Sequence, residues 1–483
     1  MANPYDQVHY PSFPFVRTHP ITTGVFAALY GRRFRPFAAS RVLEVGCGDG
    51  VNLINMALGA PQAEFLGVDL AEQPIAVARA AAQRCGCANV GFHACDLAEI
   101  DASYGRFDYI IAHGVYAWVP ARAREALIRI IGERLSDDGL AVVSYNALPG
   151  ARFRQAIRDM LLCVTDGAEN PEQKLDLARS FLAEQIEVWS DAEGDEVALK
   201  SEARRILAIP PGVLYHDELN KDFAPQLLSE TVAAGARCGL TYLCDAQPKL
   251  SEEALFPSDA LAAIRERAGG DWARFEQLAD FRSLPRFRYS LFCRGEADRR
   301  RESTRLRGLW ACDQLTVIEA DPLAPDGAAF RAANNARIKT RDPELSAFLV
   351  TLAAAFPLAV PLDPASESPN LAKHIFRLFA NQLIQVTTGQ WPLVAVPGER
   401  PKASALARLQ AANGGSMVAT LRSHIAQIED APTRALLPLM DGTRTRHELT
   451  LEMIQTDKIS YEVASTRLDE ILTTFAQAGL LAG

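Results

Sequence analysis

The chain has 483 residues, of which 48% are hydrophobic and 23% are charged. This is the composition of an ordinary globular protein, and it excludes a disordered or fibrous chain. The length exceeds what one hydrophobic core supports, so we expect two or three domains. The net charge of −9 disfavours a nucleic-acid partner, because phosphate contacts need concentrated lysine and arginine.

The sequence gives no sign of membrane insertion or secretion. No apolar run reaches the roughly 18 residues of a membrane span, and residues 1–15 lack the pattern of a signal peptide. We therefore expect a cytoplasmic protein with no membrane span. None of the nine cysteines forms a C-x-x-C pair, so we expect reduced thiols and no metal site.

Short apolar runs alternate with helical patterns through residues 1–150. The predicted strands are 41–46, 64–70, 90–96, 107–114 and 139–146. A helix is expected between the last two strands, with the sequence Asp137-Asp138-Gly139 as its stop signal. Strands that alternate with helices in this way predict an α/β fold, in which a doubly wound, Rossmann-like parallel sheet is covered on both faces.

The middle of the chain divides into two predicted parts. Residues 151–215 lose the strand signal and read as helices, which we interpret as an insertion over the cleft, with an independent middle domain as the alternative. Residues 216–298 contain two further strands, at 240–246 and 287–295. We expect these strands to join the sheet as its sixth and seventh members.

The last part of the chain, residues 308–483, is predicted to be a separate, mainly helical region that resembles winged-helix folds. The run RRRESTRLR at 299–307 precedes it, and we favour a solvated linker over a phosphate-binding patch. Two segments show a similar order of helices, which suggests a diverged repeat. The helix at 446–456 carries few basic residues, so a protein-contact or structural role is favoured over DNA binding.

The segment RVLEVGCGDGVNLINMA at 41–57 reads as a buried strand, a glycine-rich turn and a helix. In dinucleotide enzymes the spacing is G-x-G-x-x-G, and the turn receives a pyrophosphate. Here Gly46, Gly48 and Gly50 give the spacing G-x-G-x-G. The carboxylate of Glu44 would repel a diphosphate. S-adenosylmethionine fits better, because it lacks phosphates and carries an amino group and a sulfonium.

Two residues of this segment have further predicted roles. The amides at the start of the helix, around Asn52, are expected to receive the cofactor's carboxylate. Cys47 lies within the turn, and we interpret it as a packing residue on the cofactor side, with no role as a nucleophile.

Acidic residues also end the next two strands. Asp69, followed by Leu70, is placed to bind both ribose hydroxyls. Asp96 is placed to accept the adenine amino group, with Leu97 beside the ring. Three successive strand ends that each carry an acid indicate an S-adenosylmethionine site.

These motifs resemble the class I S-adenosylmethionine-dependent methyltransferases. Longer runs are similar to bacterial members that carry a methyltransferase regulatory domain, a group that includes protein-lysine methyltransferases of outer-membrane proteins. The runs lie at 5–20, 43–57, 107–120, 143–150, 214–219, 287–293, 402–414 and 436–449. The resemblance implies a seven-stranded methyltransferase sheet, a protein side chain such as lysine as acceptor, and a possible homodimer. The alternatives are a small-molecule methyltransferase and a cofactor-binding regulatory protein.

The acceptor pocket is expected beyond the fourth strand, at the carboxyl edge of the sheet. His113 and Gly114 lie there, and His113 is also counted among the cofactor-binding residues. Tyr116 and Trp118 are predicted aromatic walls that hold an ammonium by cation–π contact. Core packing is the alternative for each of the two aromatic residues.

The proline- and aromatic-rich segment at 10–20 cannot form a regular helix. We expect it to pack across the cofactor cleft as part of a lid, with Thr18 and His19 facing inward. An amine acceptor must lose a proton before it attacks, and the candidate bases are His19, His113 and Tyr145.

Overall fold

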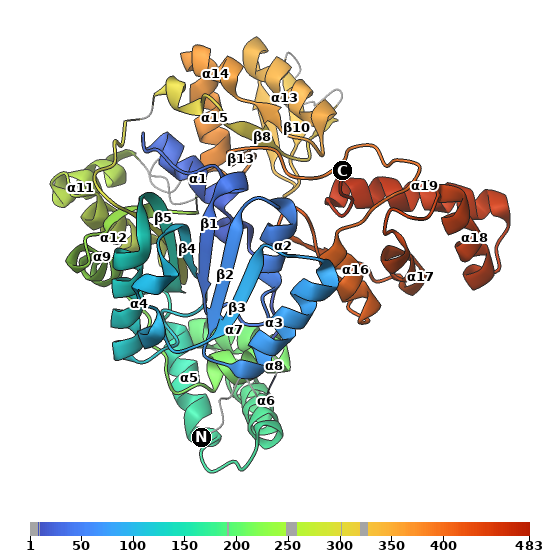
Figure 1. The fold of residues 1–483 in the computed structure, drawn as a ribbon. Coiled ribbons are helices and arrows are strands. Elements are labelled where there is room, and N and C mark those ends of the chain that lie inside the picture. Colours follow the sequence, from blue (N-terminus) through green and yellow to red (C-terminus); the bar gives the residue numbers. More distant parts are fainter. Residues whose placement is uncertain (1–7, 9, 191–192, 248–257, 301, 319–326) are drawn as a thin grey trace.

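The computed structural model describes residues 8, 10–190, 193–247, 258–300, 302–318 and 327–483. Its centre is a seven-stranded sheet in the order β3-β2-β1-β4-β5-β7-β6 (Figure 1). The strands are β1 Arg41–Val45, β2 Glu64–Asp69, β3 Val90–Ala94, β4 Phe107–Ala112, β5 Leu135–Asn146, β6 Thr241–Asp245 and β7 Phe287–Cys293. All seven predicted strands are present in one sheet, so the predicted fold class is confirmed.

The first five strands run parallel, and β7 lies antiparallel between β5 and β6. The central strands are buried on both faces, which explains why their sequences read as continuous apolar runs. The carboxyl ends of the parallel strands meet at one edge, where doubly wound sheets bind ligands.

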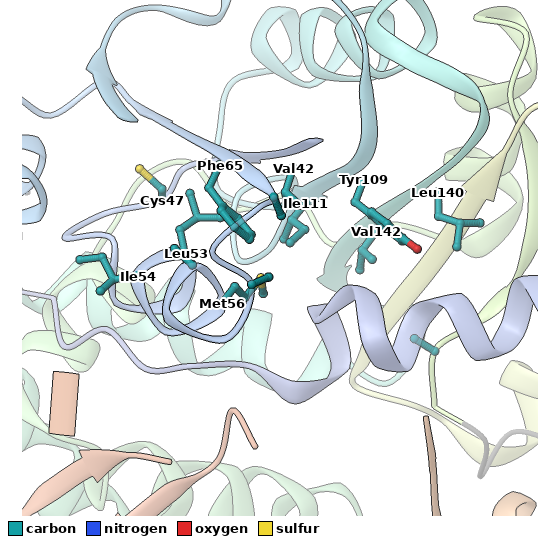
Figure 2. Packing of buried hydrophobic residues seen from close by; sticks show 14 of the residues in the cluster. Val42, Cys47, Leu53, Ile54, Met56, Phe65, Tyr109, Ile111, Leu140 and Val142 are labelled. Carbon is teal, nitrogen blue, oxygen red and sulfur yellow. The ribbon is translucent and has the colours of Figure 1, made fainter. Parts of the chain in front are cut away.

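Helices cover both faces of the sheet. One face packs against α1 Pro20–Leu29, α2 Val51–Gly59 and α3 Glu72–Cys85. Figure 2 shows part of this core, in which Leu53 and Met56 of α2 lie close to Phe65 and Val42 of the sheet. The opposite face packs against α4 Ala121–Arg134 and α9 Leu228–Arg237, and α12 Trp272–Ser283 contacts α9.

One predicted boundary is wrong. Helix α4 ends at Arg134, and β5 already begins at Leu135, so the Asp-Asp-Gly stop signal lies inside the strand. The pairing of β4 with β5 shifts register at this point, because Phe107 pairs with Leu135 while Tyr109 pairs with Leu140. The extra residues form an irregularity of the β-bulge type, a common site for glycine and polar residues.

The predicted helical insertion consists of α5 Arg152–Val164, α6 Pro171–Val188, α7 Asp195–Leu207, α8 Pro211–Val213 and the π-helix η6 Leu214–Glu218. These helices share an apolar cluster of their own, which includes Ile157, Leu182 and Ile206. The boundaries of the domains remain a prediction.

The C-terminal region has two separate cores. The first contains η8 Ser303–Leu306, β8 Trp310–Cys312, β9 Thr316–Ile318, β10 Ala328–Arg331, β11 Arg337–Thr340, α13 Pro343–Ala355, β12 Val360–Pro361, α14 Asp363–Glu367, α15 Pro369–Ala380 and β13 Gln385–Thr387. The second contains α16 Ala405–Ala412, β14 Met417–Ala419, β15 Ile425–Gln427, α17 Ala431–Leu436, η9 Leu437–Leu439, α18 Arg446–Asp457 and α19 Tyr461–Ala478. Helix α16 contacts α2 and α3, so the second core lies beside the sheet domain (Figure 1).

The remaining elements are short or peripheral: η2 Val16–Thr18, η3 Phe37–Ala39, η4 Leu97–Glu99, η5 Ala102–Tyr104 and α11 Ser258–Ala268. Within the described ranges, no helix is both long enough and apolar enough to cross a bilayer.

Candidate active site

The glycine turn follows β1 at the carboxyl edge of the sheet. Gly46 has φ +72°, and a Cβ atom there would lie 2.2 Å from Cγ2 of Val115. Gly50 has φ +75° and is the N-cap of α2. Both positions lie in the left-handed region that favours glycine, and the close approach at Gly46 leaves no room for a side chain.

Glu44 is a buried carboxyl group beneath this turn. Its side chain is 4% exposed, and Oε1 accepts a hydrogen bond of 2.7 Å from Nδ2 of Asn52. Burial raises the pKa of Glu44 to about 8, and the negative charges of Asp69 and Asp49 add to this effect. Within the described part of the chain, Oε2 of Glu44 is buried without a hydrogen-bond partner.

Asn52 connects the turn to the N-terminal segment. Its Oδ1 accepts a hydrogen bond of 2.9 Å from the backbone N–H of Phe15, and its Nδ2 lies 3.3 Å from Oγ1 of Thr18. Oγ of Ser12 lies 3.3 Å from the position that a Cβ of Gly48 would occupy. The N-terminal segment therefore packs against the glycine turn, as a lid would.

Asp69 organises the loop after β2. Its Oδ2 accepts a hydrogen bond from the N–H of Gly48, and its Oδ1 accepts one from the N–H of Ala71, each at 2.9 Å. These two bonds hold the carboxylate beside the glycine turn at the carboxyl edge of the sheet. Leu70, the next residue, is 64% exposed at this edge.

Three further predicted residues follow β1 or β3 in the chain. Asp96 is exposed, caps η4 and accepts a hydrogen bond of 2.9 Å from the N–H of Ala98. Leu97 is half-buried beside it. Cys47 is buried in the core shown in Figure 2, and burial raises the pKa of its thiol. A buried, protonated thiol is a packing residue.

His113 follows β4 and is tightly held. Its Nδ1 lies 2.8 Å from Oγ of Ser144, and the same oxygen accepts a hydrogen bond of 2.9 Å from the N–H of Gly114. The ring packs against Phe15, with 4.0 Å between the ring centroids. Burial and the positive charge of Arg17 lower the pKa of His113 to about 4, so the ring is neutral at pH 7.

His19 does not face the site as predicted. Its Nδ1 accepts a hydrogen bond of 3.1 Å from the N–H of Ile21, so the ring caps α1. The ring packs against Phe37 and Trp391, and burial lowers its pKa to about 3. We therefore leave His19 out of the acceptor site, while Thr18 does face Asn52.

The predicted aromatic walls have other roles. Tyr116 is 3% exposed and lies in the core beneath α4 and α9. The ring of Trp118 packs against Phe223 and carries the guanidinium groups of Arg154 and Arg158, whose Cζ atoms lie 5.0 and 5.2 Å from its centroid. Arginines of the helical insertion thus already make cation–π contacts with the ring of Trp118.

Tyr145 is also unsuited to the role of base. Its side chain is 1% exposed and is hydrogen-bonded to Oγ of Ser290 at 2.9 Å. Burial raises its pKa, which keeps the phenol protonated. We leave Tyr145 out of the acceptor site.

Sequence reasoning missed the groups that surround His113. The ring of Tyr289 stacks on it at 5.4 Å, and Phe287 contacts its edge at 6.0 Å. The guanidinium of Arg17 lies 5.5 Å from the centroid of Tyr289. The antiparallel position of β7 beside β5 brings Tyr289 opposite Ser144, and an alternation of aromatic residues in FRYSLFC was the available signal.

This geometry fits a phosphate-free nucleoside that carries a cationic group. The unpaired Oε2 of Glu44 suits an amino group, the side chain of Asp69 suits a ribose, and the glycine turn admits close approach of a ligand to the backbone. Together with the strand order, these features define a class I S-adenosylmethionine-dependent methyltransferase domain.

Comparisons with known proteins agree with this class. Three families match: "Methyltransferase domain" over residues 37–203, "Predicted methyltransferase regulatory domain" over 210–294, and "PKMT, C-terminal winged helix domain" over 399–467. The chain belongs to the S-adenosylmethionine-dependent methyltransferases that carry this regulatory domain and this winged-helix domain, and the predicted cofactor is confirmed.

Two curated relatives are uncharacterized proteins of Rickettsia prowazekii. The first is 34% identical over 297 residues, which cover 61% of this chain and 53% of that protein. The second is 34% identical over 178 residues, which cover 37% of this chain and 71% of that protein. The chain thus spans only about half the length of the first relative.

A solved structure has the same fold over nearly the whole chain. The structure of PKMT2 from Rickettsia typhi superposes with a TM-score of 0.86 and 23% identity, and it covers 98% of this chain and 100% of its own. The same protein has also been solved in complex with AdoHcy. The likeness extends to the C-terminal cores as well as the sheet domain.

Proposed function

We propose that this protein transfers a methyl group from S-adenosylmethionine to lysine side chains of proteins in the cytoplasm. The observation that carries the proposal is the likeness over 98% of the chain to PKMT2, joined with the match to a winged-helix domain described for PKMT. The C-terminal cores are part of that likeness.

The cofactor supplies a methyl group on a positively charged sulfur. The lone pair of a neutral amine forms the new N–C bond, and the electron pair of the S–C bond stays with sulfur. The methylated amine then gives its extra proton to water as it leaves. The protein aligns the reacting atoms and excludes water.

The residues of this chain suit an amine acceptor. Phe15, Phe287 and Tyr289 form an apolar surface around His113 at the carboxyl edge. Arg17 adds a positive charge to this surface and lowers the pKa of His113. The same charge and the same apolar surroundings lower the pKa of an amine bound there, so the neutral, nucleophilic form is favoured.

The proposal is tested by incubating the protein with cofactor labelled in its methyl group and a bacterial extract. We expect label in the protein fraction, and acid hydrolysis should release it as methylated lysine. Extract whose lysines have been acetylated beforehand serves as the control and should remain unlabelled. Label in small molecules alone would favour the small-molecule alternative, and cofactor binding without any label would favour a regulatory protein.

A further inference from the structure

Two buried side-chain oxygens at the carboxyl edge of the sheet have no hydrogen-bond partner among the described residues. One is Oε2 of Glu44 at the end of β1, and the other is Oδ1 of Asn146 at the end of β5. Buried polar atoms are nearly always paired, so each unpaired one calls for an explanation. The cofactor's amino group explains the first oxygen and leaves the second unexplained.

The sheet places both oxygens on the same face. Side chains alternate along a strand, so Glu44 points to the same side as Val42, and Asn146 points to the same side as Leu140 and Val142. Val42, Leu140 and Val142 belong to the core that packs against α1 and α2. Figure 2 shows Val42 and Val142 within this one core. Asn146 thus lies on the face where Asn52 and the N-terminal segment cover the cleft.

The neighbours of Asn146 are those of His113. Ser144, which is hydrogen-bonded to His113, lies two residues before Asn146 and therefore on the same face of β5. Across the strand pair, Ser144 lies opposite Tyr289 and Asn146 lies opposite Phe287. Directly opposed residues have neighbouring side chains, so Asn146 borders the aromatic surface around His113.

The chemistry of this surface calls for an acceptor of hydrogen bonds. Oγ of Ser144 accepts the N–H of Gly114 and lies 2.8 Å from Nδ1 of His113, so the ring is held in a fixed place at this edge. A neutral amine attacks with its nitrogen lone pair, so a protein group that accepts one of its N–H bonds can turn that lone pair toward the methyl group. An amide oxygen can accept this N–H, and it attracts the unreactive ammonium form less strongly than a carboxylate does.

We propose that Asn146 binds the acceptor amine, with Oδ1 accepting an N–H and so orienting the nitrogen lone pair toward the cofactor's methyl group. This inference rests on the proposed function, because it names the residue that holds the acceptor. The N–C bond forms from the amine's lone pair, the S–C electron pair stays with sulfur, and the amide is unchanged by the step.

The test is the binding of n-butylamine, the reactive end of a lysine side chain, to the full-length protein saturated with adenosylhomocysteine. Isothermal titration calorimetry at pH 9 should show that Asn146→Leu weakens butylamine binding by at least about tenfold. The reason is that one hydrogen bond between uncharged, buried groups is lost. Adenosylhomocysteine affinity should stay within about twofold of the wild type.

A matched control is Asn55→Leu, because Asn55 is also a buried asparagine with an unpaired Oδ1 among the described residues, but its amide group is bonded to Thr420 of the C-terminal region. We expect its butylamine affinity to equal that of the wild type. If Asn146→Leu does not fold, Asn146→Ala removes the same oxygen with a smaller side chain and should show the same loss. Asn146→Asp restores an acceptor and should recover binding.

The outcomes separate the two proposals. Wild-type affinity for butylamine in Asn146→Leu, or no butylamine binding in the wild type, overturns the assignment of Asn146 whatever the acceptor is. Loss of butylamine binding in Asn146→Leu, together with an extract in which no lysine is labelled, keeps Asn146 as an amine-binding residue and overturns protein lysine as the acceptor.

Discussion

At the scale of single residues, the buried carboxyl group of Glu44 connects the site to stability. The pKa of Glu44 is raised to about 8 in the folded protein from 4.5 in the unfolded chain. Between these values the folded state holds a proton that the unfolded chain has released, so stability falls as the pH rises through this window. The site thus keeps a group that costs stability at neutral and alkaline pH.

Glu44→Gln tests this cost in the cofactor-free protein. One proton bound only in the folded state changes the free energy of unfolding by about 1.4 kcal/mol per pH unit. This pH dependence should be absent in the variant, because glutamine does not titrate. Urea unfolding at pH 5.5, 7 and 8.5 measures the free energy of unfolding of both proteins. The value for the variant minus the value for the wild type should increase as the pH rises. Parallel stability curves for the two proteins would contradict the burial of an ionisable group at this position.

Asp69 is predicted to carry much of the cofactor's affinity. Asp69→Ala leaves the ribose hydroxyls and the N–H of Gly48 unpaired, which should weaken adenosylhomocysteine binding by about 2–4 kcal/mol. Isothermal titration calorimetry measures the change. Asp101→Ala is the control, because Asp101 accepts a similar backbone bond from Ser103 in an exposed turn, and its affinity should be unchanged. Unaltered affinity in Asp69→Ala would remove our assignment of this residue.

The predicted site residues differ in where their neighbours come from. Glu44, Gly46 and Asp69 lie in one β–α–β unit, and local spacing indicates their positions. The sequence does not show that His19 packs against Trp391, because that residue lies more than 300 positions away. The prediction that His19 faces the site could not take this contact into account. The occupied face of Trp118 depends on arginines of the helical insertion. No local pattern contains such information.

At the scale of elements, the strands were predictable because buried parallel strands have continuous apolar sequences. The start of β5 was not predictable, because the bulge at its beginning depends on the pairing with β4. The sequence predicted that β7 belongs to the sheet, but it did not indicate that β7 lies between β5 and β6. Strand order is set by packing between distant segments.

The turn after β1 allows a prediction that separates backbone strain from crowding. Gly46 and Gly239 have similar φ angles of +72° and +74°, but only Gly46 has an atom close to the position of a Cβ. Gly239→Ala should cost about 1–2 kcal/mol through its backbone conformation alone. Gly46→Ala should cost at least about 1 kcal/mol more, because Val115 must move.

Thermal and urea unfolding of both variants measure this difference. Gly46→Ala should also reduce adenosylhomocysteine affinity, because the turn that borders the cofactor shifts. Equal destabilisation by the two substitutions would show that the side chain of Val115 moves aside without lowering the free energy of unfolding.

At the scale of the whole molecule, the C-terminal winged-helix core is attached to the helix that carries Asn52. Asn55, one turn further along α2, donates hydrogen bonds of 3.1 Å to the carbonyl of Thr420 and 3.0 Å to Oγ of Ser423. The loop that joins β14 to β15 thus contacts α2. Together with α16, which contacts α2 and α3, these bonds hold the second C-terminal core against the sheet domain.

Asn55→Ala should loosen this attachment by about 1–2 kcal/mol, the cost of two lost hydrogen bonds. Hydrogen exchange of the amides at 417–427 should become faster, while the central strands stay protected. Asn89→Ala is the matched control, because Asn89 bonds the carbonyls of Ala60 and Ala63 within the sheet domain. Faster exchange at 417–427 in both variants would show that the hairpin responds to general destabilisation.

The antiparallel strand β7 limits how far this protein can be shortened. The methyltransferase family match ends at residue 203, whereas the outer neighbour of β5 is supplied by residues 287–293. A fragment that ends at 203 would present the unpaired backbone of β5 to other molecules, which is a template for aggregation. The smallest part worth expressing for crystallisation or engineering therefore extends from the N-terminal segment at least to Cys293.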